Sequence, residues 1–193
     1  MKKSQGQSPK GEVRIIAGLW RGRKLPVLNA EGLRPTGDRV KETLFNWLMP
    51  YIHQAKCLDG FAGSGSLGIE ALSRQAEKVT FLEKDKTVAH QLKKNLQTLK
   101  CTEKQAQVFN QSCLDFLKLP QNQPHFDVVF LDPPFHFGLA EQAIRLLTEN
   151  NWLYPNALIY VETEKDSHVN TPEHWTLLKE KTTGMVNYRL YQN

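Results

Sequence analysis

A glycine-rich turn between an apolar strand and a helical pattern limits the possible folds of this chain more than any other feature. Residues 57–68, CLDGFAGSGSLG, begin in an apolar run and turn through Gly60, Gly63 and Gly65 before the helical pattern opens near Gly68. In open α/β sheets such a turn follows a strand, and its backbone N–H groups bind a polar or anionic ligand at the helix N-terminus. The segment therefore predicts an α/β fold with a ligand site at the carboxyl edge of the sheet.

The middle of the chain supports this fold because strand patterns alternate with helical patterns. Strands are predicted at residues 56–59, 79–83, 127–132 and 157–162, and helices at 67–74, 86–99 and 139–149. The last two strand patterns are nearly continuous apolar runs, which suit strands buried on both faces. This alternation predicts a doubly wound parallel sheet.

The two ends of the chain have a different pattern. Apolar runs at 13–17 and 25–28 predict a small N-terminal β-hairpin, and a helix follows from a Thr36 cap to Pro50. Near the C-terminus, alternation in 175–177 and 186–190 about a Thr-Gly turn predicts an antiparallel hairpin that completes the sheet. We expect an arm over residues 1–30, which adds little to the core, and one domain over 31–193.

Several classes of protein are not expected from the composition. No apolar run approaches the roughly 20 residues that cross a bilayer, and the polar first ten residues have no signal-peptide core, so a soluble cytoplasmic protein is predicted. The three cysteines and six histidines lack the close spacing of metal ligands, so no metal is predicted. Nothing in the sequence demands a partner chain, and we expect a monomer.

Positive charge is concentrated at the N-terminus. Residues 1–49 hold ten Lys or Arg against four Asp or Glu, a net charge of +6, whereas residues 50–193 hold 15 against 16. A phosphate-binding arm has such a distribution, and so does a solvated basic surface. The residues offered for RNA binding are Arg14, Arg21, Arg23, Lys24, Arg34 and Arg39 for phosphates and Trp20 for stacking.

The glycine turn by itself leaves the ligand open. Gly63, Gly65 and Gly68 have the spacing of the dinucleotide fingerprint, and Glu83 ends the next strand, where an acid binds ribose hydroxyls. These residues support a nicotinamide cofactor nearly as well as S-adenosylmethionine, and a tight turn without a ligand is the remaining alternative. A phosphate-binding P-loop is excluded because no Gly-Lys-Ser/Thr follows.

The pattern Asp-x-Phe-Ala-Gly-Ser-Gly that starts at Asp59 resembles the first motif of class I S-adenosylmethionine-dependent methyltransferases. The resemblance implies a Rossmann-like, seven-stranded mixed sheet. It also implies that the loop contacts the methionine part of the cofactor and that Glu83 contacts the ribose. By its position before the Phe116-Leu117 pair, Ser112 lies where this type of enzyme often has an acid or amide near the adenine. The implied cofactor-binding residues are Asp59, Gly60, Phe61, Gly63, Gly65, Glu83, Ser112 and Cys113.

A second motif, Asp132-Pro133-Pro134-Phe135, ends the apolar strand at 127–132. Adjacent prolines fix the backbone, and the carboxyl edge of the sheet is shared with the glycine turn. The Asp132 carboxylate and the Pro133 carbonyl can accept hydrogen bonds from an aromatic amine and turn its lone pair towards a sulfonium methyl group, while Phe135 stacks on the base. A proline-rich strand exit with an ordinary aspartate is the alternative.

The motif Asp-Pro-Pro-Phe resembles the Asn/Asp-Pro-Pro-aromatic motif of enzymes that methylate adenine N6, guanine N2 and protein glutamine. Residues 14–25, 33–48, 61–74, 160–162 and 188–191 further resemble the RsmD-like family, whose members methylate guanine N2 in bacterial small-subunit ribosomal RNA. The resemblance implies a guanine in an RNA hairpin of an assembled or nearly assembled subunit as substrate. The alternatives are an adenine-N6 methyltransferase, a nicotinamide-dependent oxidoreductase, which leaves residues 132–135 unexplained, and a non-catalytic RNA-binding assembly factor.

Overall fold

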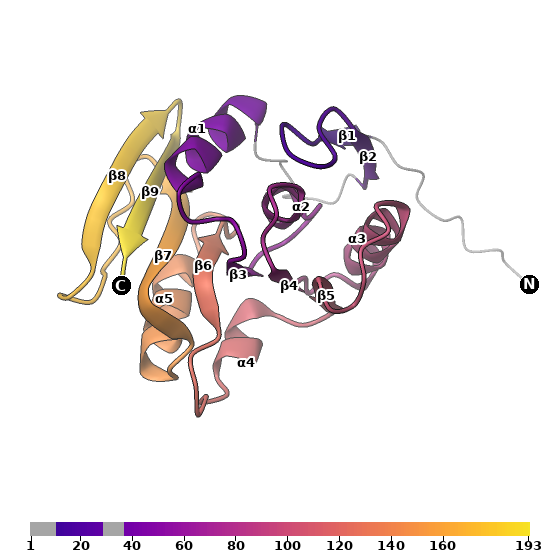
Figure 1. Cartoon of the computed structure of the whole chain (residues 1–193). Helices are drawn as coiled ribbons and strands as arrows, with labels where there is room; N and C mark the ends of the chain where they lie inside the picture. The colour runs from indigo at the N-terminus through magenta and orange to yellow at the C-terminus, as the bar shows by residue number, and fades with distance from the viewer. Residues whose placement is uncertain (1–10, 29–36) are drawn as a thin grey trace, which may run out of the picture.

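A computed structural model describes residues 11–28 and 37–193. Its main feature is a seven-stranded sheet with helices on both faces and a separate two-stranded hairpin (Figure 1). The strands of the large sheet, in chain order, are β3 (Lys56–Asp59), β4 (Lys78–Leu82), β5 (Ala106–Phe109), β6 (Phe126–Leu131), β7 (Leu153–Glu164), β8 (Thr176–Thr183) and β9 (Val186–Gln192). The predicted α/β fold, with its mixed sheet and antiparallel C-terminal hairpin, is confirmed.

The strand order in the sheet is β5-β4-β3-β6-β7-β9-β8. Strands β3 to β7 are parallel, whereas β9 runs antiparallel to both β7 and β8. The chain winds outwards from β3 in one direction and from β6 in the other, so the point of reversal lies between these two strands. In open α/β sheets the ligand binds at the carboxyl ends of the strands at this point.

Two layers of helices cover the sheet (Figure 1). One core cluster combines the sheet with α1 (Asp38–Leu48), α2 (Ser66–Ser73) and α3 (Lys86–Thr98), and the other combines it with α4 (Cys113–Leu117) and α5 (Leu139–Glu149). Along β6, Phe130 belongs to the first cluster and Val129 and Leu131 to the second, as the alternation of side chains requires. Burial on both faces explains why this strand is a continuous apolar run.

The N-terminal hairpin consists of β1 (Gly11–Arg14) and β2 (Lys24–Val27), paired antiparallel. The apolar side chains that face the domain are Val13, Leu25 and Val27 of the strands and Ile15 directly after β1. They are at most 5% exposed and belong to the same core cluster as α1, α2 and α3. The hairpin itself is confirmed. The expectation that the arm adds little to the core is wrong, because alternate residues of both strands are buried against the domain.

Other differences from the sequence analysis are local. Helix α1 begins after an N-cap at Gly37 rather than at Thr36, which lies outside the described residues. Strand β5 and helix α4 were not predicted from the residue pattern, because β5 is a half-exposed edge strand of four residues and α4 has only five residues. Periodicity needs a longer segment to be visible. Among the described residues no helix is both long and apolar enough to span a membrane.

Candidate active site

The glycine turn and the Asp132–Phe135 loop meet where the strand order reverses. Asp59, the last residue of β3, pairs with Phe130 of β6, and the next amide, Gly60 N–H, donates to the Phe130 carbonyl over 3.0 Å. A Cβ atom at Gly60 would lie 3.2 Å from Cδ2 of Leu131, directly before Asp132. The two motifs therefore share the carboxyl edge of the sheet, as predicted.

The glycine turn is held against the end of β4. The Gly63 N–H donates to Oε2 of Glu83 over 2.8 Å, and Oε1 of the same carboxylate accepts from the Asp85 N–H. Gly63 has φ 53°, a value in the left-handed region that glycine adopts without strain. The structure thus places the half-buried carboxylate of Glu83 beside the turn.

Asp59 lies beneath the turn rather than on its surface. Its side chain is 2% exposed, and its Oδ2 accepts a hydrogen bond from the Gly68 N–H of α2 over 3.0 Å. Burial raises the pKa of Asp59 to about 7, with the Gly68 hydrogen bond opposing the shift and the charge of Glu83 adding to it. A Cβ atom at Gly68 would come within 2.2 Å of the Phe81 ring, so helix and strand pack too closely there for a side chain. Asp59 therefore fixes α2 relative to the turn.

The residues expected near the adenine form one wall of this edge. The Ser112 hydroxyl caps α4, accepting from the Asp115 N–H over 3.1 Å and donating to the Asp115 carboxylate over 2.9 Å. Cys113 is buried, with its Sγ 3.0 Å from where a Cβ of Gly60 would lie, and burial raises the pKa of its thiol. Phe61 is half-buried against the second core cluster. Cys113 thus packs beside Gly60, and the half-buried Ser112 precedes it as the cap of α4.

The loop after β6 exposes its residues to different degrees. Pro133 is buried, Asp132 and Phe135 are half-buried, and Pro134 is exposed. The following residue, His136, has φ 70°, and both its N–H and its Nδ1 contact Oε1 of Glu164 at the end of β7, the latter over 3.0 Å. The loop is therefore fixed at one end by β6 and at the other by β7.

The structure adds two residues of β7 that the residue pattern did not assign to the site. The buried Tyr160 donates its hydroxyl hydrogen to Oε2 of Glu162 over 2.9 Å. Burial raises the pKa of Glu162, with the Tyr160 hydrogen bond opposing the shift. Burial also raises the pKa of Tyr160, with smaller contributions from the charges of Glu162 and Asp132. Two signals in the sequence concern these residues: an acid after an apolar run, which is too common to identify a site, and the family resemblance over residues 160–162, which assigned neither residue a role.

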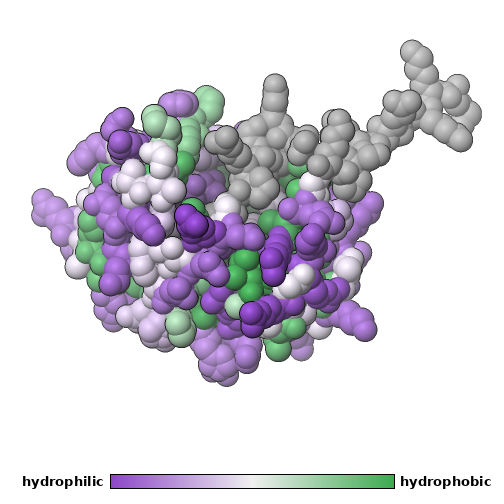
Figure 2. Space-filling model, turned by 90° about the horizontal axis from the view of Figure 1, so that it is seen from above, coloured by the Kyte–Doolittle hydropathy of each residue, from purple (hydrophilic) through white to green (hydrophobic). Residues whose placement is uncertain are grey.

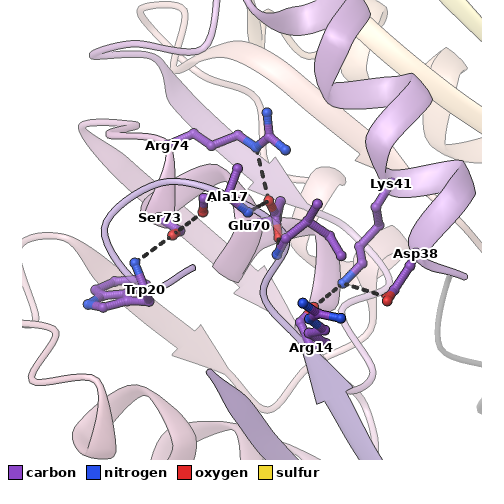
Figure 3. A network of polar contacts seen from close by, with 9 residues as sticks. Arg14, Ala17, Trp20, Asp38, Lys41, Glu70, Ser73 and Arg74 are labelled. Carbon is purple, nitrogen blue, oxygen red and sulfur yellow. Dashed lines mark hydrogen bonds and ion pairs between the residues drawn. The ribbon is translucent and has the colours of Figure 1, made fainter. Parts of the chain in front are cut away.

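The N-terminal hairpin is attached to α2 by a buried network of polar contacts (Figure 3). Glu70 is fully buried and accepts hydrogen bonds from the N–H groups of Ile16 and Ala17 over 2.9 and 3.0 Å and from Nε of Arg74 over 2.9 Å. Ser73 donates to the Ala17 carbonyl over 2.6 Å and accepts from the Trp20 N–H, as Figure 3 also shows. The segment between β1 and β2 is therefore held by α2.

Lys41 of α1 completes this attachment from the other side. Its side chain is 1% exposed, and its Nζ donates to the Arg14 carbonyl and lies 3.9 Å from the Asp38 carboxylate (Figure 3). Burial lowers the pKa of Lys41, and the negative charges of Glu70 and Asp38 oppose that shift. The hairpin thus has a defined orientation relative to both helices.

The hairpin gathers most of the predicted RNA-binding residues. Arg14, Arg21, Arg23 and Lys24 are exposed, and this side of the molecule is predominantly hydrophilic with small apolar patches (Figure 2). Lys24 lies 3.3 Å from Glu12, and Arg23 donates to the Thr98 carbonyl over 3.2 Å.

The predicted RNA-binding set has three other members, of which the structure describes Trp20 and Arg39. Trp20 is half-buried and packs against the core, which leaves less of its ring for stacking than a free arm would. Arg39 is exposed in the first turn of α1. Arg34 lies outside the described residues. Within residues 11–28 and 37–193, no group of three or more His, Cys, Asp or Glu side chains could hold a metal ion.

Known proteins match this chain over nearly its whole length. The family described as "Conserved hypothetical protein 95" matches residues 13–192. Ribosomal RNA small subunit methyltransferase D of Haemophilus influenzae is 84% identical over 193 residues, all of both chains, and the Escherichia coli protein of the same name is 54% identical over 98% of this chain and 94% of its own.

Solved structures agree with the fold. A Haemophilus influenzae crystal structure described as "putative methylase" has a TM-score of 0.86 at 81% identity and covers 95% of this chain and 99% of its own. A crystal structure described as "a putative methyltransferase complexed with SAH" has a TM-score of 0.69 at 15% identity, covers 88% of this chain and 53% of its own, and shows the shared fold.

Proposed function

Since the chain belongs to the family described as "Conserved hypothetical protein 95", which is the RsmD-like family of the sequence resemblance, we propose that it methylates small-subunit ribosomal RNA. The relatives named ribosomal RNA small subunit methyltransferase D support this activity. We further propose that the methyl group passes from S-adenosylmethionine to N2 of one guanine. The observation that carries the proposal is the meeting of the glycine turn and the Asp132–Phe135 loop where the strand order reverses.

The residues at the glycine turn fit S-adenosylmethionine. The half-buried Glu83 carboxylate lies at the end of β4, where it can accept hydrogen bonds from ribose hydroxyls, and its contact with Gly63 N–H brings the turn beside it. The hydroxyl of Ser66, the first residue of α2, is buried without a hydrogen-bond partner among the described residues, so it offers a polar contact at the turn. The sulfonium of the cofactor supplies an already activated methyl group.

The Asp132–Phe135 loop would hold the target base. The Asp132 carboxylate and the Pro133 carbonyl accept hydrogen bonds from the two N–H groups of the exocyclic amine, which directs its lone pair at the methyl group. Because the prolines fix the backbone and Pro133 is buried, the two acceptors keep their relative position without reorganisation. Phe135 stacks on a base that has left its helix. Direct displacement would then need no covalent intermediate: the cofactor would leave as S-adenosylhomocysteine, and the Asp132 carboxylate would accept the proton that the methylated amine releases.

The hairpin would supply affinity for the RNA backbone. Its attachment through Glu70 and Lys41 keeps Arg14, Arg21 and Arg23 in a fixed relation to the catalytic loop. An RNA hairpin within an assembled or nearly assembled small subunit is the proposed partner. In this arrangement the phosphate contacts position the substrate, and the loop after β6 performs the chemistry.

Nucleoside analysis tests the proposed function. Small subunits from a strain that lacks this modification are incubated with the protein and S-adenosylmethionine labelled in the methyl group, and the RNA is digested and analysed by mass spectrometry. N2-methylguanosine is the expected product, and Asp132→Ala is expected to form little of it. N6-methyladenosine would contradict the guanine assignment, and no transferred label with any small-subunit RNA would contradict the enzyme assignment.

A further inference from the structure

Glu162 is a half-buried acid at the carboxyl edge that the proposed transfer does not use. It is the tenth residue of β7 and pairs with Tyr188 of β9, which fixes its backbone. The Tyr160 hydroxyl is its one hydrogen-bond donor among the described residues, and no Lys or Arg of residues 11–28 and 37–193 forms an ion pair with it. One of its oxygens is therefore fixed while the other retains its capacity to accept.

The register of the sheet places this acid beside the catalytic loop. Phe130 pairs with Tyr160, and Leu131 pairs with Val161, in the parallel pair β6–β7. Asp132 directly follows β6, and Glu162 follows Val161 within β7. Continued at the spacing of neighbouring strands, this register brings the two backbones to about 4.8 Å from each other, with both side chains on the face of Phe130 and Tyr160. The charges of both carboxylates contribute to the raised pKa of Tyr160, which agrees with this placement.

Two neighbouring carboxylates match the hydrogen-bonding edge of guanine. Guanine presents its N1–H next to the N2 amine, so two adjacent groups on this edge are donors, whereas adenine presents an unprotonated N1 next to its N6 amine. We propose that Glu162 accepts a hydrogen bond from N1–H of the target guanine while Asp132 and Pro133 hold the amine, so that Glu162 selects guanine over adenine. This inference rests on the proposed function.

The environment of Glu162 supports a substrate partner over a purely structural role. Burial raises its pKa because a single hydrogen bond from Tyr160 does not replace the water that the carboxylate loses. A donor from the substrate would satisfy the second oxygen at the moment of binding. With adenine, the carboxylate would instead face the lone pair of N1, and an unpaired buried acceptor is costly. The same acid thus favours one base and opposes the other.

A base analogue distinguishes recognition of N1–H by Glu162 from a general effect of Glu162 on activity. The methylated guanine is first located by mass spectrometry, and a synthetic segment then carries 2-aminopurine or inosine at that position in small subunits reconstituted from the ligated RNA. 2-Aminopurine keeps the amine but has an unprotonated N1, and inosine lacks the amine. Initial rates give kcat/KM for wild type, Glu162→Gln and the exposed control Glu149→Gln on each substrate.

We expect wild type and Glu149→Gln to prefer guanine over 2-aminopurine by about 10- to 100-fold, the range for one hydrogen bond to a charged group. In Glu162→Gln this preference should fall at least about tenfold, because the carboxamide can donate to the unprotonated N1 of 2-aminopurine. A structural role would lower both rates together and leave their ratio unchanged. An unchanged ratio in a folded Glu162→Gln protein overturns the proposal.

A second variant covers a failure of Glu162→Gln to fold, which calorimetry of S-adenosylmethionine binding would reveal. Tyr160→Phe keeps the ring and removes the donor that orients Glu162, so it should lower the guanine preference several-fold, and an unchanged preference would overturn the proposal as well. Failure of the proposed function would give a different result. The wild-type protein would then form a product other than N2-methylguanosine or would methylate the inosine-containing subunit, independently of the ratios of kcat/KM on guanine and 2-aminopurine.

Discussion

The buried contacts under the N-terminal hairpin and the carboxyl edge of the sheet both place carboxylates in low-dielectric surroundings, but they differ in how completely those carboxylates are hydrogen-bonded. Glu70, under the hairpin, accepts from two backbone N–H groups and from Arg74. Glu162, at the edge, accepts from Tyr160 alone among the described residues. A buried acid whose hydrogen bonds are complete within the protein stabilises the fold, whereas one with remaining capacity is suited to a ligand.

Helix α2 connects the two regions. Its first turn is fixed to Asp59 through the Gly68 N–H, and its last turn holds the hairpin through Glu70 and Ser73. The orientation of the basic hairpin and the shape of the glycine turn thus depend on the same eight-residue helix. The following predictions test the division into a structural and a functional region, starting with the largest expected effect.

Replacing Glu70 should lower stability more than any change at the carboxyl edge. Glu70→Ala leaves two backbone N–H groups and the Arg74 guanidinium without their acceptor, and breaking such a buried pair typically costs about 3–5 kcal/mol in the free energy of unfolding. Urea denaturation measures the change, with the exposed Glu77→Ala as the matched control. A loss below about 1 kcal/mol would show that the network does not hold the hairpin.

Replacing Asp132 should lower activity with little effect on stability. Losing one well-placed acceptor at the reacting group typically costs about 2.7–4 kcal/mol of barrier, so Asp132→Ala should lower kcat by about 10²- to 10³-fold. Its affinity for S-adenosylmethionine should remain near wild type in calorimetry. Glu83→Ala should show the reverse, with weaker cofactor binding and a smaller change in turnover at saturating cofactor. Near-normal turnover of Asp132→Ala would remove Asp132 from the mechanism.

Asp59 should make stability depend on pH below neutrality. Its pKa in the folded protein is raised to about 7, whereas the unfolded chain has the ordinary value near 3.8. Between these values the unfolded state has lost the proton that the folded state retains, so the free energy of unfolding falls as pH rises, by up to about 1.4 kcal/mol per pH unit. Asp59→Asn should remove this slope between pH 4 and 7 in urea denaturation. Identical slopes in the two proteins would contradict the raised pKa.

Replacing the basic residues of the hairpin should weaken RNA binding without changing cofactor binding. Of the effects predicted here, the effect per replaced residue should be the smallest. A combined Arg21→Ala, Arg23→Ala and Lys24→Ala variant should bind small subunits more weakly, and the slope of log affinity against log salt should decrease by up to about one unit for each lost phosphate contact. Trp20→Ala should leave the slope unchanged if its ring stacks on a base.

The matched control for the hairpin variant removes three exposed lysines elsewhere, Lys165, Lys179 and Lys181. It lowers the net charge equally and should leave the slope close to that of wild type. Equal slopes for wild type and the hairpin variant would mean that the hairpin is a solvated basic surface. A chain shortened to begin near residue 31 cannot serve as this control, because it would lose the buried side chains of Val13, Ile15 and Leu25.

Most of the fold could be predicted from the sequence, because local patterns carry it. Four strands of the parallel part of the sheet and three of its helices were located to within a few residues, since burial on one or both faces leaves a period that can be read along the chain. Strand β5 and helix α4 could not be predicted in this way because each is too short to show a period. The hairpin was predicted as an element, but not its burial.

For the site, the sequence by itself determined the two motifs, because a glycine turn and a Pro-Pro loop set their own backbone conformations within a few residues. The tertiary structure decided what those motifs touch. Leu131 and Val161, the residues before Asp132 and Glu162, are neighbours only because β6 pairs with β7, and Glu70 meets the amides of Ile16 and Ala17 across more than 50 residues of chain. Contacts between distant segments depend on how the layers of the fold pack. The pattern of residues along the chain does not contain the position of one element relative to another.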